Sequence, residues 1–154
     1  MVYRSYRSYR GYNYDPAYTS HAHGWSSAPT STLTTYILGL GVMRPMGKEW
    51  VVKPVHVPGL SSDSGVRGGF ETPLGWFGVD LLWVLNGETT GVLGLEVRIE
   101  TPVGTIGEFV VPRVFGSSEG VEVRVDGVVW VKDPGLSGVV LSGGVHSVSV
   151  RVDI

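Results

Sequence analysis

The chain has 154 residues, about the size of one ordinary domain, and can bury one compact core. Hydrophobic residues make up 42% of it and charged residues 17%, which excludes a wholly disordered chain. The net charge of −2 and the lack of roughly 18 consecutive apolar residues argue against nucleic-acid and membrane partners. The absence of cysteine excludes disulfides and thiolate metal sites but leaves the cellular compartment unknown.

The first 18 residues hold six of the seven tyrosines, and Tyr-Arg-Ser or Tyr-Arg-Gly triplets run from Tyr3 to Gly11. A three-residue period fits neither helix nor strand burial. Aromatics interleaved with arginines can stack on single-stranded nucleic acid, but three arginines offer few phosphate contacts. We therefore expect residues 1–19 to form a flexible tail that has no nucleic-acid partner.

One helix is predicted, from about Ser27 to Leu40. Its apolar side chains recur at i, i+3, i+4 and i+7 and so form a single face for burial. They are Leu33, Tyr36, Ile37 and Leu40. A serine can cap its start, and Gly39 and Gly41 can stop it. Threonines inside the segment have low helix propensity, so tertiary packing has to hold the helix.

From residue 42 onward, short β-rich runs are divided by Gly, Pro, Ser and Asp. Eight or nine strands are predicted, over residues 49–57, 66–71, 76–85, 92–100, 105–111, 121–125, 128–132, 137–141 and 145–153. Apolar and polar residues alternate in 92–100 and 145–153, which predicts one exposed face for each strand. Asp126-Gly127 between apolar runs predicts a hairpin turn. The pattern favours an all-β fold, an antiparallel, jelly-roll-like β-sandwich.

Several short segments in a fixed order carry a family resemblance. They are His21-Ala22-His23-Gly24-Trp25-Ser26, Trp50-Val51-Val52-Lys53-Pro54, Glu71-Thr72-Pro73-Leu74-Gly75, Glu108-Phe109-Val110-Val111-Pro112, Val125-Asp126-Gly127 and Gly143-Gly144-Val145-His146-Ser147-Val148. Together they resemble the C-terminal region of α-L-rhamnosidases, from about Tyr14 to the end. In that family, a His-Gly-Trp-Ser segment leads into the last helix of an (α/α)6 barrel, and a β-sandwich follows.

Three parts are predicted: a flexible Tyr/Arg-rich tail over 1–19, the motif and helix over 20–41, and a C-terminal β-sandwich over 42–154. The resemblance implies the last two, whereas the tail departs from the family pattern. In the parent enzyme the sandwich would brace the barrel. The apolar helix face would then pack on barrel helices, so in this chain it needs another partner, self-association or contact with the sandwich.

The resemblance also implies an activity for the parent, the hydrolysis of terminal α-L-rhamnose with inversion, by two carboxyls roughly 6.5–9.5 Å apart. It places His23 beside the sugar pocket with Trp25 packed nearby, although a His-x-His segment before a helix is more often simply polar. The barrel helices that carry the carboxyls would lie upstream, and of the 14 acidic residues only Asp15 lies near the motif. We therefore assign no catalytic residue and expect a non-catalytic portion of such a glycoside hydrolase.

Other chemistry is poorly supported. Residues 116–120 match the Gly-x-Ser-x-Gly nucleophile pattern, but a strand and not a helix is predicted to follow, which favours a loop. His21 and His23 have no third metal ligand at recognisable spacing, and His56 and His146 stand singly in predicted strands. We expect neither a metal site nor a cofactor.

The alternative function is a free-standing carbohydrate-binding or structural β-sandwich module. Four tryptophans lie in predicted strands: Trp50, Trp76, Trp83 and Trp130. A strand tryptophan is usually part of the core, but some sandwiches bind sugars on an exposed indole face. Exposure of Trp76 would favour sugar binding, whereas burial of all four would favour a structural domain.

Overall fold

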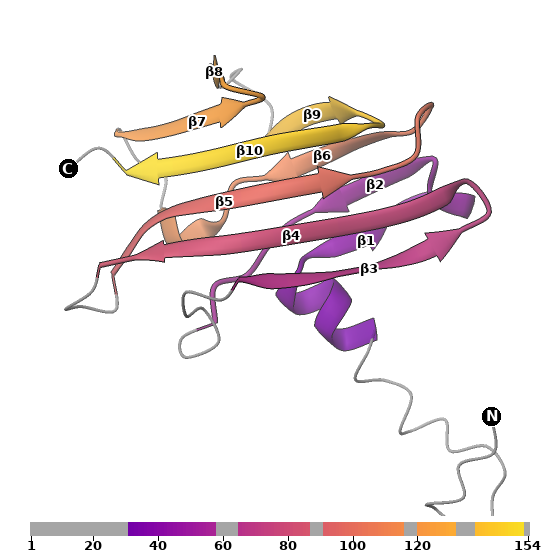
Figure 1. Cartoon of the computed structure of the whole chain (residues 1–154), viewed down its shortest axis with the longest axis horizontal. Helices are drawn as coiled ribbons and strands as arrows, with labels where there is room; N and C mark the ends of the chain where they lie inside the picture. Colours follow the sequence, from indigo (N-terminus) through magenta and orange to yellow (C-terminus); the bar gives the residue numbers. More distant parts are fainter. Residues whose placement is uncertain (1–30, 58–64, 87–90, 116–119, 132–137, 153–154) are drawn as a thin grey trace, which may run out of the picture. The chain divides into compact units, whose positions relative to one another are not determined.

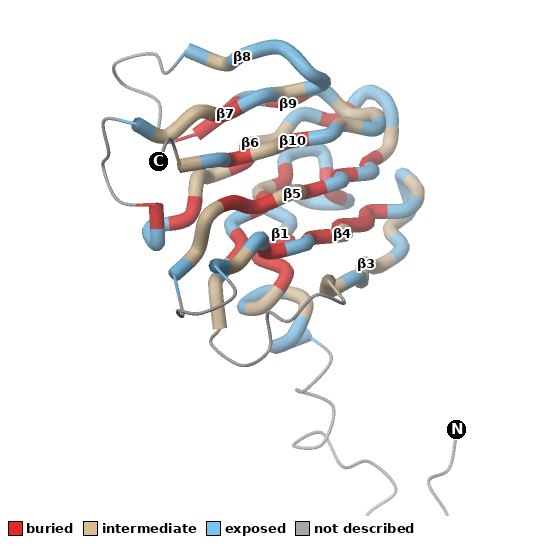
Figure 2. The backbone as a smooth tube through the Cα atoms, turned by 60° about the vertical axis from the view of Figure 1, so that its left-hand side comes forward, coloured by how far each residue is buried: buried red, intermediate tan, exposed pale blue. Residues whose placement is uncertain are grey.

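The structure, a computed structural model, describes residues 31–57, 65–86, 91–115, 120–131 and 138–152. Two β-sheets stack face to face, with the buried side chains between them (Figure 1). Figure 2 shows buried residues in red recurring along strands from both sheets. The predicted all-β sandwich is confirmed.

One sheet has four strands in the order β1-β2-β6-β9. They are β1 (Leu40–Val42), β2 (Glu49–Val52), β6 (Ile106–Val110) and β9 (Gly138–Ser142). β2 and β6 run parallel, which the purely antiparallel prediction did not include. A parallel pair needs a long crossover, and three strands of the other sheet lie between β2 and β6 in the sequence.

The other sheet has six strands in the order β3-β4-β5-β10-β7-β8, and all its neighbours are antiparallel. They are β3 (Val66–Thr72), β4 (Gly75–Leu85), β5 (Val92–Glu100), β7 (Val121–Val125), β8 (Val128–Trp130) and β10 (Val145–Val152). Across the two sheets, eight of the nine predicted strands have nearly the same bounds as observed strands. The predicted strand 49–57 instead ends at Val52, and β1 was not predicted.

Within the described ranges the helical segments are short. A π-helix, η4, spans Leu33–Ile37, and two 3-10 turns, η5 and η6, span Pro45–Gly47 and Arg113–Phe115. The Leu38 N–H donates to the carbonyl of Leu33 at 3.2 Å and closes the end of η4. None of the helical segments in the described ranges has the length and apolarity needed to cross a lipid bilayer.

The predicted end of the helix at Leu40 is wrong. Gly39 has φ +70°, a left-handed conformation that ends helices and suits glycine, and a Cβ there would overlap the Lys53 carbonyl. Leu40 then starts β1 opposite Val52 and is 1% exposed. Burial in the sandwich therefore outweighs the local helical period.

The expected apolar helix face is consequently divided. Leu33 and Tyr36 are exposed, by 56% and 66%, whereas Leu40 belongs to the core and cannot meet a partner. Leu38, outside the predicted face, is also buried and approaches Gly68 of β3. Of the four residues of the predicted face, Leu33 and Tyr36 are thus exposed, Ile37 is partly buried and Leu40 is buried.

Trp50 lies at the centre of the core and is 2% exposed. Its indole covers Gly107, its register partner on β6, where a Cβ would overlap the ring. The indole N–H donates to Thr105 Oγ1 at 3.0 Å, and the Thr105 hydroxyl donates to the Pro102 carbonyl at 2.7 Å. The one polar atom of the ring is thus satisfied inside the core.

The β7–β8 hairpin turn is tied to β10. Asp126 and Gly127 have φ +50° and +83°, as in a two-residue turn of the type predicted from Asp-Gly. One Asp126 carboxylate oxygen accepts the Ser147 N–H at 2.8 Å, and the other lies 2.8 Å from His146 Nδ1. His146 Nε2 lies 2.9 Å from the Ser142 carbonyl oxygen, so this ring links the turn to the end of β9.

Replacing Gly107 by alanine should destabilise the domain by about 1–3 kcal/mol, because a methyl group would displace the Trp50 ring from a close-packed core. The free energy of unfolding, measured by urea denaturation, tests this. Gly41→Ala on β1 is the matched control, since a Cβ there would make only an ordinary 3.5 Å contact with Val51. Equal effects of the two substitutions would contradict the packing role of Gly107.

A second stability prediction concerns acid. The Ser147 amide, followed by the His146 side chain, holds the pKa of Asp126 below its ordinary value of 3.8. A depressed folded-state pKa contributes stability that is present above the ordinary value and is lost as the pH falls through the folded-state pKa. Asp126→Asn should therefore destabilise the protein at neutral pH, and the difference from wild type should shrink in acid.

Urea midpoints between about pH 7 and about pH 3 measure that difference. Glu71→Gln is the control for losing one negative charge, because no side-chain hydrogen bond or ion pair of Glu71 is seen among the described residues. An Asp126→Asn effect that stays constant with pH would contradict the assignment.

Candidate functional site

The four strand tryptophans differ in exposure. Trp50 and Trp83 are buried, Trp130 is partly buried, and Trp76 is 45% exposed. The condition for a purely structural module, burial of all four, is therefore not met. The condition that favours sugar binding, exposure of Trp76, is met.

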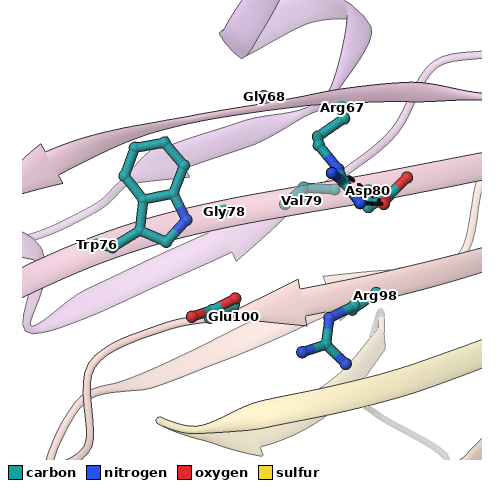
Figure 3. A pocket seen from close by; sticks show the side chains of 8 residues that line it. All are labelled: Arg67, Gly68, Trp76, Gly78, Val79, Asp80, Arg98 and Glu100. Atoms are coloured by element: carbon teal, nitrogen blue, oxygen red, sulfur yellow. Dashed lines mark hydrogen bonds and ion pairs between the residues drawn. The ribbon is translucent and has the colours of Figure 1, made fainter.

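The indole of Trp76 lies on the outer face of the six-stranded sheet beside Gly78 (Figure 3). A second glycine, Gly69, is also next to the ring. These glycines stand directly opposite each other on β3 and β4. A Cβ on Gly78 would overlap the indole nitrogen, and one on Gly69 would lie 2.6 Å from Cζ2. The two missing side chains provide the space for the ring, so one face contacts backbone while the side chain stays half exposed.

Four charged side chains lie to one side of this ring (Figure 3). Alternation along the strands places Arg67, Asp80, Arg98 and Glu100 on the same outer face, in adjacent positions on β3, β4 and β5. With Trp76 they line a depression of about 340 Å³ (Figure 3), which we call the Trp76 depression. Its volume lies at the lower end of the range for small-molecule sites.

The polar groups of the Trp76 depression are only partly engaged. Arg67 donates from Nε and Nη2 to the same Asp80 oxygen, Oδ2, at 2.9 and 2.7 Å. Among the described residues, Asp80 Oδ1 and the side chains of Arg98 and Glu100 have no hydrogen-bond or ion-pair partner. The depression therefore offers free donors and free acceptors, and its two arginines balance its two carboxylates.

Farther along this sheet face, charges are paired. Arg151 contacts Glu96 at 2.9 Å, and Arg124 contacts Glu122 at 2.6 Å. The hydrogen bonding that Arg124 donates to Glu122 lowers the pKa of Glu122 and raises the pKa of Arg124. These pairs are exposed and contribute little to stability. They leave fewer polar groups for a ligand than the Trp76 depression does.

The Asp126–His146 pair does not form a catalytic triad. His146 Nε2 faces the carbonyl oxygen of Ser142, where a triad would place a nucleophilic hydroxyl. In the described ranges no three His, Cys, Asp or Glu side chains are grouped to hold a metal ion. Residues 116–119 of the Gly-x-Ser-x-Gly match lie outside the described ranges, and strand β7 follows them.

A second depression, of about 480 Å³, lies between the segment after β2 and the segment after β6. His56 was predicted to lie in a strand, but it lies in the irregular segment after β2. Its ring contacts Trp83 edge-on, with the ring centroids 5.1 Å apart. Lys53 and Arg113 are the charged residues of its lining, and no carboxylate is among them. It therefore offers no acid–base pair.

The residues that the sequence assigned to a sugar pocket, His23 and Trp25, lie outside the described residues, as does Asp15. The four charged residues of the Trp76 depression were not recognised in the sequence. Their signal was available in hindsight, because they occupy alternate positions in strands whose other positions are apolar. The pairing of β3 with β4 and of β4 with β5 was needed to bring them together.

Comparison with known proteins finds similarity at the level of structure. No family model matches the sequence, and no curated protein does. The structure of α-L-rhamnosidase from Dictyoglumus thermophilum matches with a TM-score of 0.55 and 17% identity, over 76% of this chain and 12% of that chain. Streptomyces avermitilis α-L-rhamnosidase complexed with L-rhamnose matches with a TM-score of 0.50 and 19% identity, over 77% of this chain and 10% of that one.

This chain therefore has the fold of a small part of two α-L-rhamnosidases. The sequence resemblance to the C-terminal region of that family agrees with the structural match. At this level of identity the likeness concerns the fold, and the chain spans about a tenth of the matched proteins.

Proposed function

We propose that this chain is the accessory β-sandwich region of an α-L-rhamnosidase-like glycoside hydrolase and does not hydrolyse glycosides by itself. The supporting observation is the structural match, which takes in about three quarters of this chain but about a tenth of each rhamnosidase. The sequence segments that carry the family resemblance, which begin with His21-Ala22-His23-Gly24-Trp25-Ser26, support the same assignment by their order along the chain.

The chemistry of the reaction supports a non-catalytic role. Inverting hydrolysis needs one carboxyl to protonate the leaving oxygen and another to activate water across the sugar ring. Of the described carboxylates, Asp80 and Glu100 share a depression, but they stand on an outer sheet face and Asp80 is paired with Arg67. An open face does not exclude water or hold a substrate between two opposed carboxyls.

His23 and Trp25 would serve the pocket of a complete enzyme. In this proposal His23 contacts the sugar and Trp25 packs beside it. A histidine that contacts the sugar supplies positioning and cannot replace either carboxyl.

The described part of the helix supplies a contact surface for that barrel or for a second copy of this chain. Leu33 and Tyr36 are both exposed, and large apolar side chains grouped on a surface mark interaction sites. Ile37 borders them, whereas Leu40 is excluded by its burial in β1.

The purified chain should not hydrolyse an aryl α-L-rhamnoside above background. General acid and general base catalysis are each worth roughly 10²–10⁴ in rate, and the carboxylates of the described residues suit neither role. Release of the aryl alcohol, followed by absorbance, measures turnover. Asp15→Asn and an Asp80→Asn/Glu100→Gln double variant are assayed in parallel, and turnover that either change abolishes would overturn the proposal.

The chain purified by itself should self-associate at high concentration, because Leu33 and Tyr36 are large apolar side chains exposed on its surface. Light scattering should show a molar mass that rises with concentration, and Leu33→Lys/Tyr36→Lys should remain monomeric. Val103→Lys is the matched control, since Val103 is 88% exposed near a turn outside this surface. A wild-type chain that stays monomeric, or association unchanged in the double variant, would contradict this contact surface.

A further inference from the structure

We propose that the Trp76 depression binds a neutral pyranose sugar, with the apolar face of the sugar on the indole and its hydroxyls on Asp80, Arg98 and Glu100. This site lies on the outer face of the six-stranded sheet, and its lining residues come from β3, β4 and β5. The inference does not depend on the origin of the chain in a glycoside hydrolase.

Two glycines next to the Trp76 indole hold the ring in place. Gly69 and Gly78 are paired across β3 and β4, and a side chain at either position would displace the indole. The ring is thus supported in one orientation before any ligand arrives. A pre-positioned aromatic surface loses little conformational entropy on binding, which favours its use for recognition.

The polar side chains of the Trp76 depression match the hydroxyls of a sugar. Each sugar hydroxyl can donate one hydrogen bond and accept others, so a pyranose needs donors and acceptors side by side. Arg98 supplies donors, and Glu100 and Asp80 Oδ1 supply acceptors, all without protein partners in the described part of the chain. Apolar contact with a few placed polar groups is typical of small-molecule sites.

The charges of the Trp76 depression cancel. Arg67 and Arg98 offset Asp80 and Glu100, so the depression has no net charge to attract an anion or a cation. A quaternary ammonium would also favour several aromatic faces, and Trp76 is the one aromatic side chain of this lining. A neutral ligand with many hydroxyls fits these groups best.

The same features argue against a protein partner as the occupant. The fully buried core of a protein interface is depleted of charged residues. Here four charged side chains line the depression beside the ring, and covering it with protein would bury Arg98 and Glu100, which have no partner among the described residues. A sugar leaves such groups partly hydrated while it covers the indole.

The experiment follows the Trp76 indole N–H by NMR in the ¹⁵N-labelled full chain, with Trp76→Ala to assign the signal. The neutral probes are the methyl glycosides of α-L-rhamnose, α-D-mannose and β-D-glucose. Glucuronate and tetramethylammonium test the charge argument. At least one neutral glycoside should shift the signal saturably, with a Kd on the order of 1 mM, because the depression is shallow and its contacts few.

Substitutions locate the site. Backbone amide shifts report binding when the indole is absent, and Trp76→Ala should weaken affinity about tenfold or more by removing the ring. Gly78→Ala should also weaken it by displacing the indole, with the core signals unchanged. Leu82→Ala is the matched control, because Leu82 is exposed on β4 beyond the depression and its loss should leave binding intact.

Three outcomes would overturn the proposal. The first is that no neutral glycoside shifts the Trp76 signal. The second is that binding survives Trp76→Ala unchanged. The third is that glucuronate or tetramethylammonium binds more tightly than every neutral glycoside. Rhamnoside turnover in the separate assay would bear on the accessory role and not on this site.

Discussion

Burial between the two sheets holds this molecule together, and the rest of the structure depends on it. Trp50 and Phe109 enter the core from the four-stranded sheet, and Phe77 enters from the six-stranded sheet. Because successive side chains of a strand point to opposite faces, placing these rings inward assigns every alternate residue outward. The outer faces, including the Trp76 depression, are therefore consequences of how the core is packed.

One steric rule operates on both sides of the sandwich. A flat indole can lie along a pleated sheet only where the neighbouring positions lack side chains. Inside, Trp50 covers Gly107, and its N–H finds Thr105. Outside, Trp76 covers Gly69 and Gly78. The first arrangement stabilises the core, whereas the second holds an aromatic surface at the boundary with water, where it can meet a ligand.

The two proposed roles use different parts of the chain. The likeness to small parts of two rhamnosidases concerns the fold. The proposed accessory role uses the exposed residues Leu33 and Tyr36 as its contact surface. Sugar binding at Trp76 would add a second role on the sheet face, since its groups are those of the sandwich itself. A sandwich that braces a catalytic domain and also holds a sugar would combine the two functions considered from the sequence.

The sequence by itself determined the all-β class, most strand positions and the Asp126-Gly127 turn, because alternation and turn chemistry are local properties. It failed at Leu40, where a helical period was outweighed by pairing with Val52 and burial in the core. Only the tertiary structure decided the parallel pairing of β2 with β6 and the meeting of Trp76 with Asp80, Arg98 and Glu100. Both depend on which strands become neighbours, and strand pairing is set by long-range packing that no local pattern records.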